Sequence, residues 1–245
     1  MKNLLLSVCL LVKIIQSCFA GPQIDVIEYY GTSFRIPAPE GFVRFDKTYP
    51  QVAEPIRRQM GISSDLLCAY GREQEILARK TGKVSHFKIL FEATAASGMR
   101  SVNVTPVLFG HIKDVFKVNA FDAYGVDPQH IADKEAEAVN NYLQKEQHST
   151  DALKIIQPHL IDKFDNRLNS ICLTAVAKLE ITMHEKREEF VALSVLSAMN
   201  LHRRAIFITC VGDYDGAETI KTFKSAVTTW RDQIIELNPE EPSGS

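Results

Sequence analysis

The stretch Ile171–Val211 reads ICLTAVAKLEITMHEKREEFVALSVLSAMNLHRRAIFITCV and decides the fold. Its first part has an apolar residue at every second position, which predicts a strand: Ile171, Leu173, Ala175, Ala177, Leu179 and Ile181. Phe190–Met199 is almost wholly apolar, as is typical of a central strand covered on both faces. Ala205–Val211 predicts a third strand. Because the links Thr182–Glu189 and Asn200–Arg204 are short and polar, we expect an antiparallel meander.

The meander is followed by a predicted amphipathic helix that lays Trp230 on the sheet. Its apolar residues recur at helical spacing: Ile220, Phe223, Val227, Trp230 and Ile234. Just before it, Asp215 and Glu218 fit a capping box, which would satisfy the free N–H groups of the first turn. Together with Asp213 they also partly fit a calcium-binding loop. The later oxygen ligands of such a loop are missing, so we favour the cap and expect no metal site.

Upstream of the meander, shorter patterns predict further strands. Thr32–Ile36 and Asp65–Tyr70 each read as a strand. Ser85–Ala93 alternates, which predicts a half-buried strand. Its apolar side holds Phe87, Ile89 and Phe91, and its solvent side holds His86, Lys88 and Glu92.

Several helices are expected between these strands. Tyr49–Met60 predicts a helix that Pro55 breaks, and Thr105–Lys117 predicts one with Pro106 in its first turn. A third is expected to start at Asp127 and Pro128, with a stripe of apolar residues at helical spacing: Ala132, Ala136, Val139 and Leu143. Pro158 interrupts His148–Ser170, so that segment is assigned to no single element.

The order of these elements predicts an α+β fold, in which helices pack on a mainly antiparallel sheet and a C-terminal amphipathic helix closes the domain. We expect one domain over residues 24–237. The tail 238–245 contains two prolines and a glycine and is expected to be disordered.

The N-terminus has the layout of a secretory signal peptide over residues 1–20. Lys2 precedes the apolar run Leu4–Val12, and small residues flank a cleavage point after Ala20. The mature chain is therefore expected to be exported, either periplasmic or secreted, without a transmembrane segment. An alternative reads Ile15-Gln16-Ser17-Cys18 as a lipobox, in which case a lipid on Cys18 would anchor the protein to a membrane.

The composition limits which classes of partner are expected and whether the cysteines are expected to form a disulfide. The 245 residues carry a net charge of −2, so no basic surplus favours nucleic acid, and we expect no nucleic-acid partner. Cleavage after Ala20 would leave Cys68, Cys172 and Cys210, all within apolar runs. Buried free thiols are the favoured interpretation; if a disulfide forms, Cys172–Cys210 is the expected pair, because both lie in strands of one sheet.

The chain lacks the common catalytic motifs. It contains no nucleophile elbow, no phosphate-binding glycine loop and no zinc-protease helix, so no cofactor is expected. His111 and Asp114 lie three residues apart on one face of a predicted helix, and His202 lies in a predicted turn. These three are the candidate catalytic residues, although each can also be explained as an ordinary solvent-exposed residue without a catalytic role.

The ends of the chain carry one family resemblance. Gly31–Phe42 reads GTSFRIPAPEGF, a short strand leading into a proline-rich turn just after the signal peptide, and a meander with the Trp230 helix closes the chain. This combination resembles the PsbP-like group of exported α+β domains, and also uncharacterised exported bacterial proteins. The resemblance implies a helix–sheet–helix sandwich with a binding or accessory role, and it supplies no catalytic residue.

The sequence therefore favours a non-enzymatic, exported binding or accessory protein of the cell envelope, with a protein or small-molecule partner that it does not identify. The first alternative is a secreted hydrolase whose site is assembled from His111, Asp114 and His202. The second is a lipoprotein anchored at Cys18.

Overall fold

The computed structural model describes residues 23–60, 64–84, 86–115, 152–183 and 186–239, together with isolated helical residues between 129 and 144. Its strands are β1 (Ile24–Tyr29), β2 (Thr32–Pro37), β3 (Val43–Arg44), β4 (Ser64–Gly71), β5 (Ile89–Ala96), β6 (Ala152–Phe164), β7 (Ser170–Met183), β8 (Lys186–Leu201) and β9 (Arg204–Asp213). Its helices are α2 (Pro50–Met60), α3 (Glu73–Lys80), the short 3-10 turn η1 (Ser97–Met99), α4 (Pro106–Val115) and α7 (Ala217–Leu237).

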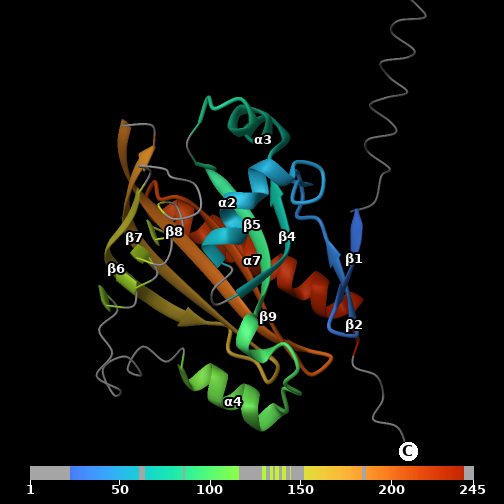
Figure 1. The fold of residues 1–245 in the computed structure, drawn as a ribbon. Coiled ribbons are helices and arrows are strands. Elements are labelled where there is room, and N and C mark those ends of the chain that lie inside the picture. Colours follow the sequence, from blue (N-terminus) through green and yellow to red (C-terminus); the bar gives the residue numbers. More distant parts are fainter. Residues whose placement is uncertain are drawn as a thin grey trace, which may run out of the picture.

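One seven-stranded sheet organises the molecule, with the order β3-β4-β5-β9-β8-β7-β6 (Figure 1). Every neighbouring pair in it is antiparallel. The remaining strands, β1 and β2, form a separate hairpin. The predicted α+β class with a mainly antiparallel sheet is confirmed.

The predicted meander is also confirmed, with longer strands and tighter turns than expected. β8 continues outward through the exposed residues Arg187, Glu188 and Glu189. The turn from β8 to β9 consists of His202 and Arg203 alone, both in the left-handed region with φ of 47° and 60°. Strand pairing therefore extends through charged residues that a hydrophobicity pattern assigns to the links.

Helix α7 closes one face of the sheet, as predicted. Phe223, Val227, Trp230 and Ile234 are all buried in its interface with the sheet. The Trp230 ring meets Phe91 edge-on, with 5.4 Å between ring centroids. Edge-to-face contact is a favoured arrangement for aromatic pairs, and it fixes the helix on the middle of the sheet.

Side chains of α7 and of Asn238, which follows it, form hydrogen bonds with the backbone of the β1–β2 hairpin. Asn238 Nδ2 donates to the Arg35 carbonyl at 2.7 Å, and the Arg35 N–H donates to Asn238 Oδ1 at 2.8 Å. Trp230 Nε1 donates to the Pro37 carbonyl at 2.7 Å. Asn238 is thus buried, which corrects the expectation of a tail that is disordered from residue 238; residues 240–245 lie outside the described part of the chain.

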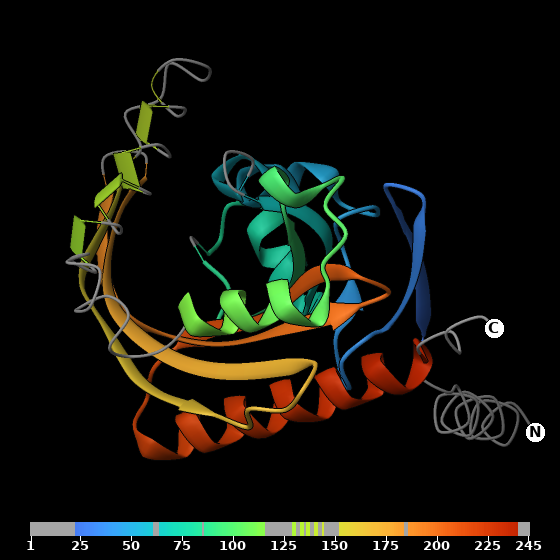
Figure 2. The ribbon, with the colours of Figure 1, turned by 90° about the horizontal axis from the view of Figure 1, so that it is seen from below.

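The sheet is curved, and the helices lie on both of its sides (Figure 2). Helix α7 runs along the convex side, while α2, α3 and α4 lie on the concave side. Over one end of the concave side, Ala53 and Ile56 of α2 pack with Ala69 and Leu90. Over the other end, α4 packs through Phe109.

The outer edge of β6 is covered by side-chain amides. Asn140 Nδ2 donates to the Leu153 carbonyl at 2.9 Å, and the Leu153 N–H donates back to Asn140 Oδ1 at 2.7 Å. Gln129 makes the same two-way contact with the Ile155 carbonyl and the Gln157 N–H, each at 2.8 Å. These amides satisfy backbone groups that an open edge strand would expose.

Two sequence predictions about prolines are wrong. Helix α2 runs continuously through Pro55, whose exposed position leaves water free to satisfy the carbonyl that loses its partner. Strand β6 runs through Pro158, within a segment that was assigned to no element. The pairing of β6 with β7 is irregular between Ile156 and His159, where Gln157 has a φ of 50°. Pro158 therefore lies at a position that needs no backbone hydrogen bond to the neighbouring strand.

The other predicted helices have different outcomes. The helix predicted over Thr105–Lys117 is confirmed as α4, which begins at Pro106, one residue later than predicted. Of the helix predicted from Asp127, Ala136 is helical and buried, and the other stripe residues lie outside the described part of the chain. The capping box before α7 is wrong: Gly216 occupies the cap position with a φ of 102°, and no side chain caps the first turn.

The three cysteines in the described ranges are buried, as expected, and all are free. A Cys172–Cys210 bridge is excluded by the register, because Cys172 pairs with Ser197 and Cys210 with Val195, both on β8. Strand β8 therefore lies between them, and two strand spacings of about 4.8 Å exceed the reach of a disulfide. Among the helices whose residues are described, none is both long and apolar enough to cross a bilayer.

Candidate functional site

The structure does not assemble the three predicted catalytic residues. His111 and Asp114 lie on the exposed side of α4, on the concave side of the sheet. His202 lies in the β8–β9 turn and contacts Phe34 of the β1–β2 hairpin, with 6.1 Å between ring centroids. Phe34 belongs to the core beneath α7, on the opposite side of the sheet. No contact in the described residues joins His202 to the other two.

The concave side of the sheet carries a half-buried apolar row on β7. Ile171 lies beneath α4 in a core with Phe109, and alternation places every second residue after it on the same side. These next residues are Leu173, Ala175, Ala177 and Leu179, which we call the apolar row, and each is partly exposed. Their neighbours on β8 are Leu196, Ser194, Ala192 and Phe190. The row is thus neither fully buried nor fully exposed on the concave side of the sheet.

A buried acid lies on the same side of the sheet, at Glu92 of β5. Phe91 and Ala93 belong to the core with Trp230, so Glu92, between them, points to the concave side. The side chain is only 5% exposed, which corrects the prediction that it faces solvent on a half-buried strand. Burial in an apolar environment raises the pKa of Glu92 to about 8.

The strand register places Glu92 and the apolar row on one line. Glu92 pairs laterally with Thr209 on β9, Thr209 with Leu196 on β8, and Leu196 with Leu173 on β7. Three strand spacings of about 4.8 Å separate Glu92 from Leu173 by roughly 14 Å. The line ends at Lys163 on β6, the partner of Leu173.

His86 lies at one end of the concave side of the sheet. His86 Nε2 lies 2.9 Å from Asp213 Oδ1, and the His86 ring stacks on Phe190 at 4.1 Å with an interplanar angle of 8°. Glu188 Oε2 lies 4.0 Å from the other ring nitrogen. Asp213, considered above as part of a metal loop, is therefore a partner of His86, and no described residues form a cluster that could hold a metal.

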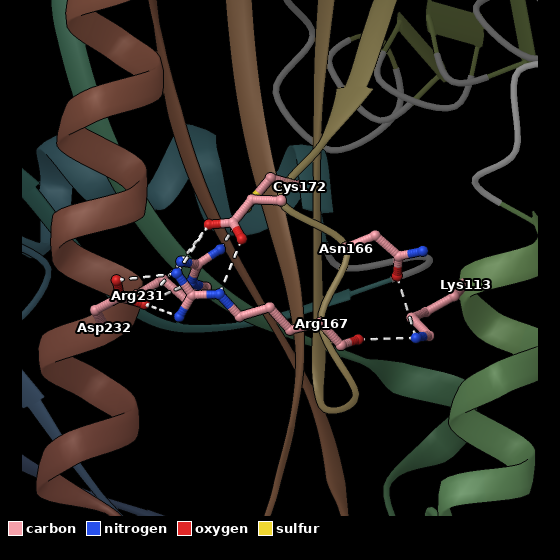
Figure 3. Close-up of polar contacts among 7 residues, drawn as sticks. Lys113, Asn166, Arg167, Cys172, Arg231 and Asp232 are labelled. Atoms are coloured by element: carbon pink, nitrogen blue, oxygen red, sulfur yellow. Dashed lines mark hydrogen bonds and ion pairs between the residues drawn. The ribbon is translucent and has the colours of Figure 1, made fainter.

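Beneath α7, on the convex side, lies a second polar cluster (Figure 3). Arg231 is fully buried and donates through Nη1 to Cys172 Sγ at 3.1 Å. Its Nη2 atom also contacts Asp165 at 2.6 Å and Asp232 at 2.7 Å. Arg167 contacts the same two carboxylates at 2.8 and 2.9 Å.

The charges in this cluster balance, and its thiol is not activated. Burial works to raise the pKa of Asp165, but the hydrogen bonds from Arg167 and Arg231 outweigh it and lower the pKa. Burial raises the pKa of Cys172 despite the nearby Arg231, so the thiol keeps its proton at neutral pH. The cluster is therefore suited to holding elements together rather than to nucleophilic chemistry.

The same cluster ties the β6–β7 turn to two helices. Arg167 and Asp165 of the turn contact α7, as described above. On the other side, Lys113 of α4 donates to Asn166 Oδ1 at 3.2 Å and to the Arg167 carbonyl at 2.8 Å (Figure 3). Because the turn joins the strand that carries the apolar row, these contacts fix the position of the row relative to both helices.

A separate cavity of about 410 Å³ lies between the described helical residues near 136 and the distal ends of β6 and β7. It is lined by both signs of charge, including Asp133, Glu137, Glu180 and Lys154. Three of these four groups are acidic, and one of them, Glu180, is already paired with Arg187.

Sequence reasoning identified the apolar row as a strand pattern but not as a site, because alternation does not show which side of a strand stays partly uncovered. It missed Glu92, since a polar residue in an alternating strand is normally assigned to solvent. The signal that could have found it is the sequence Leu90–Thr94 (LFEAT), in which Glu92 is the single charge in a run of apolar and small residues.

No protein-family model and no curated protein sequence matches this chain. Among solved structures, the Ran-binding protein Mog1p of Saccharomyces cerevisiae is 9% identical with a TM-score of 0.30, over 89% of this chain and 95% of that chain. A mutant of protein Mog1 is also 9% identical with a TM-score of 0.32, over 88% and 94%. Scores this low do not establish a shared fold.

Proposed function

We propose that this chain is an exported, non-enzymatic binding protein that holds an apolar small molecule on the concave side of its sheet. The observation that carries the proposal is the apolar row on β7, which is half-buried on the same concave side of the sheet as the buried Glu92. Small-molecule sites are typically concave and mostly apolar, with a few polar groups that fix orientation. The row and Glu92 fit that description.

A small molecule fits this face better than a protein partner does. A protein partner typically needs an exposed patch of roughly 800 Å², whereas each residue of the row is only partly exposed. Each methylene group that a ligand buries there contributes about 0.8 kcal/mol. A chain of several such groups is enough for binding without any catalytic machinery.

Export is proposed from the N-terminal sequence and from the resemblance to exported PsbP-like domains. Strand β1 begins at Ile24, shortly after the expected cleavage point at Ala20, so removal of residues 1–20 leaves the hairpin complete. The intact mass of the exported protein tests this part. Cleavage after Ala20 supports the proposal, and a diacylated N-terminal Cys18 would show the anchored form instead.

Binding is tested with N-phenyl-1-naphthylamine, an uncharged apolar dye that fluoresces when it leaves water. We expect saturable binding to the wild-type protein. Ala177→Gln places a polar amide in the apolar row and should weaken binding at least about fivefold. Lys178→Gln introduces the same side chain at the next position, on the opposite side of β7, and should leave binding unchanged. Non-saturable binding, or equal affinity in both variants, would overturn the proposal.

A further inference from the structure

Glu92 is a buried acid without a partner in the described part of the chain. The residue is 5% exposed, and burial is the one influence on the pKa of its carboxyl group, with no hydrogen bond or charge from a described residue acting on it. Its lateral neighbours on the concave side, Ala69 and Thr209, carry no charge. Buried acids in proteins are normally paired with a cation or hydrogen-bonded, because an isolated charge loses its hydration without compensation.

The surroundings of Glu92 distinguish it from the other acids on this side. Asp213 lies against His86 at 2.9 Å, and Glu188 lies at the exposed end of β8, near the other nitrogen of His86. Among these three described acids, Glu92 combines deep burial with a line of apolar or uncharged residues leading away from it, through Thr209 and Leu196 to Leu173. Leu196 is partly buried and packs against the cluster beneath α4. A molecule lying along that line would bring one end to the carboxyl group and the other to the apolar row.

We propose that the ligand is an amphiphile with a single apolar chain and a protonated amine, in which the amine pairs with Glu92 and the chain lies along the line toward the apolar row. This inference rests on the proposed function and adds the chemical class of the ligand. Glu92 holds a proton at neutral pH in the free protein, because burial raises its pKa to about 8, and binding of the ammonium group releases that proton. The resulting charge-assisted hydrogen bond from the ammonium group to the carboxylate is stronger than a neutral one. Glu92 then selects the headgroup, and the row binds the tail.

The test compares three ligands with the same tail: decylamine, decanol and decanoate, each displacing N-phenyl-1-naphthylamine from the wild-type protein. We expect decylamine to bind about tenfold more tightly than decanol, and decanoate to bind most weakly. In Glu92→Gln the amine and the alcohol should bind within about twofold of each other. Glu92→Met, an apolar replacement of similar size, should lose the preference for decylamine over decanol in the same way. It is the control for any effect of the glutamine amide itself.

The outcomes separate the two proposals. If decanol binds as tightly as decylamine, or if the preference for the amine survives both Glu92 variants, the headgroup inference is overturned while the apolar site stands. If none of the three ligands displaces the dye, and Ala177→Gln does not weaken dye binding, the proposed function itself fails.

Discussion

Arg231 Nη1 lies 3.1 Å from Cys172 Sγ beneath helix α7, and both residues are fully buried. This contact places a permanent cation inside the protein, at the point where α7, β7 and the β6–β7 turn meet. Asp165 and Asp232 compensate its charge. Removing the cation would leave its carboxylate partners and the thiol without a buried donor.

Arg231→Met should therefore destabilise the protein by about 3 kcal/mol, because it breaks a buried ion pair. Arg167→Met is the matched control, since Arg167 contacts the same two carboxylates but is nearly half exposed. It should cost less than about 1 kcal/mol. Urea unfolding of the two variants measures both values. Equal losses would show that burial of Arg231 does not determine the strength of the cluster.

Glu92 should make stability depend on pH. Its pKa is raised from the ordinary value of 4.5 to about 8 by burial, so the folded protein keeps a proton that the unfolded chain has lost. The contribution is complete below about pH 4.5 and is lost as the pH rises toward 8. The wild-type protein should thus be more stable at pH 5 than at pH 8.5, by on the order of a few kcal/mol.

Glu92→Gln should remove this component of the pH dependence, whereas Glu40→Gln, at an exposed turn position, should preserve it. Urea midpoints of the three proteins at the two pH values measure the effect. An unchanged difference in Glu92→Gln would mean that Glu92 is not the group that titrates.

Asn238 should be the last residue that the fold requires. A chain ending after Pro239 should be as stable as the full chain. A chain ending after Leu237 loses the two hydrogen bonds to the Arg35 backbone and should be less stable by about 1–2 kcal/mol. Hydrogen exchange at the Arg35 amide should also increase in the shorter chain. Equal exchange rates in the two truncated chains would contradict this role.

Cys68, Cys172 and Cys210 should behave as buried free thiols. In the chain from Gly21 to Ser245, three thiols should react with a disulfide reagent in denaturant without prior reduction. In the folded protein the reaction should be slow, because burial raises the pKa of Cys68 to about 12 and also raises those of Cys172 and Cys210. A count of one thiol in denaturant would instead show a disulfide.

The sequence predicted the part of the fold in which one periodicity dominates. Every second residue from Ile171 to Ile181 is apolar, and β7 follows; the 3–4 residue spacing around Trp230 gives α7. It did not predict β6, because a proline and a left-handed Gln157 interrupt the pattern at an irregularity that contacts distant in the sequence stabilise, namely the pairing with β7 and the hydrogen bonds with Gln129.

The candidate site was harder to predict, because it depends on which surfaces remain uncovered. A strand pattern shows that Ala177 shares a side with Leu179, but not that the described helices leave that side partly open. The burial of Glu92 depends on elements distant in the sequence that pack over the concave side. Arg231 was missed for a related reason: it follows Trp230 at a position where a helical pattern expects a solvated charge.

The most direct test of the proposed ligand site is a methyl NMR titration of protein labelled at alanine and leucine methyl groups with N-phenyl-1-naphthylamine. The account predicts saturable shifts at Leu173, Ala175, Ala177 and Leu179, because the aromatic dye would lie against them. Leu168 and Leu77, which are 87% and 44% exposed elsewhere on the molecule, should not shift. Shifts at Leu168 or Leu77 with an unperturbed apolar row would contradict the concave face as the binding surface.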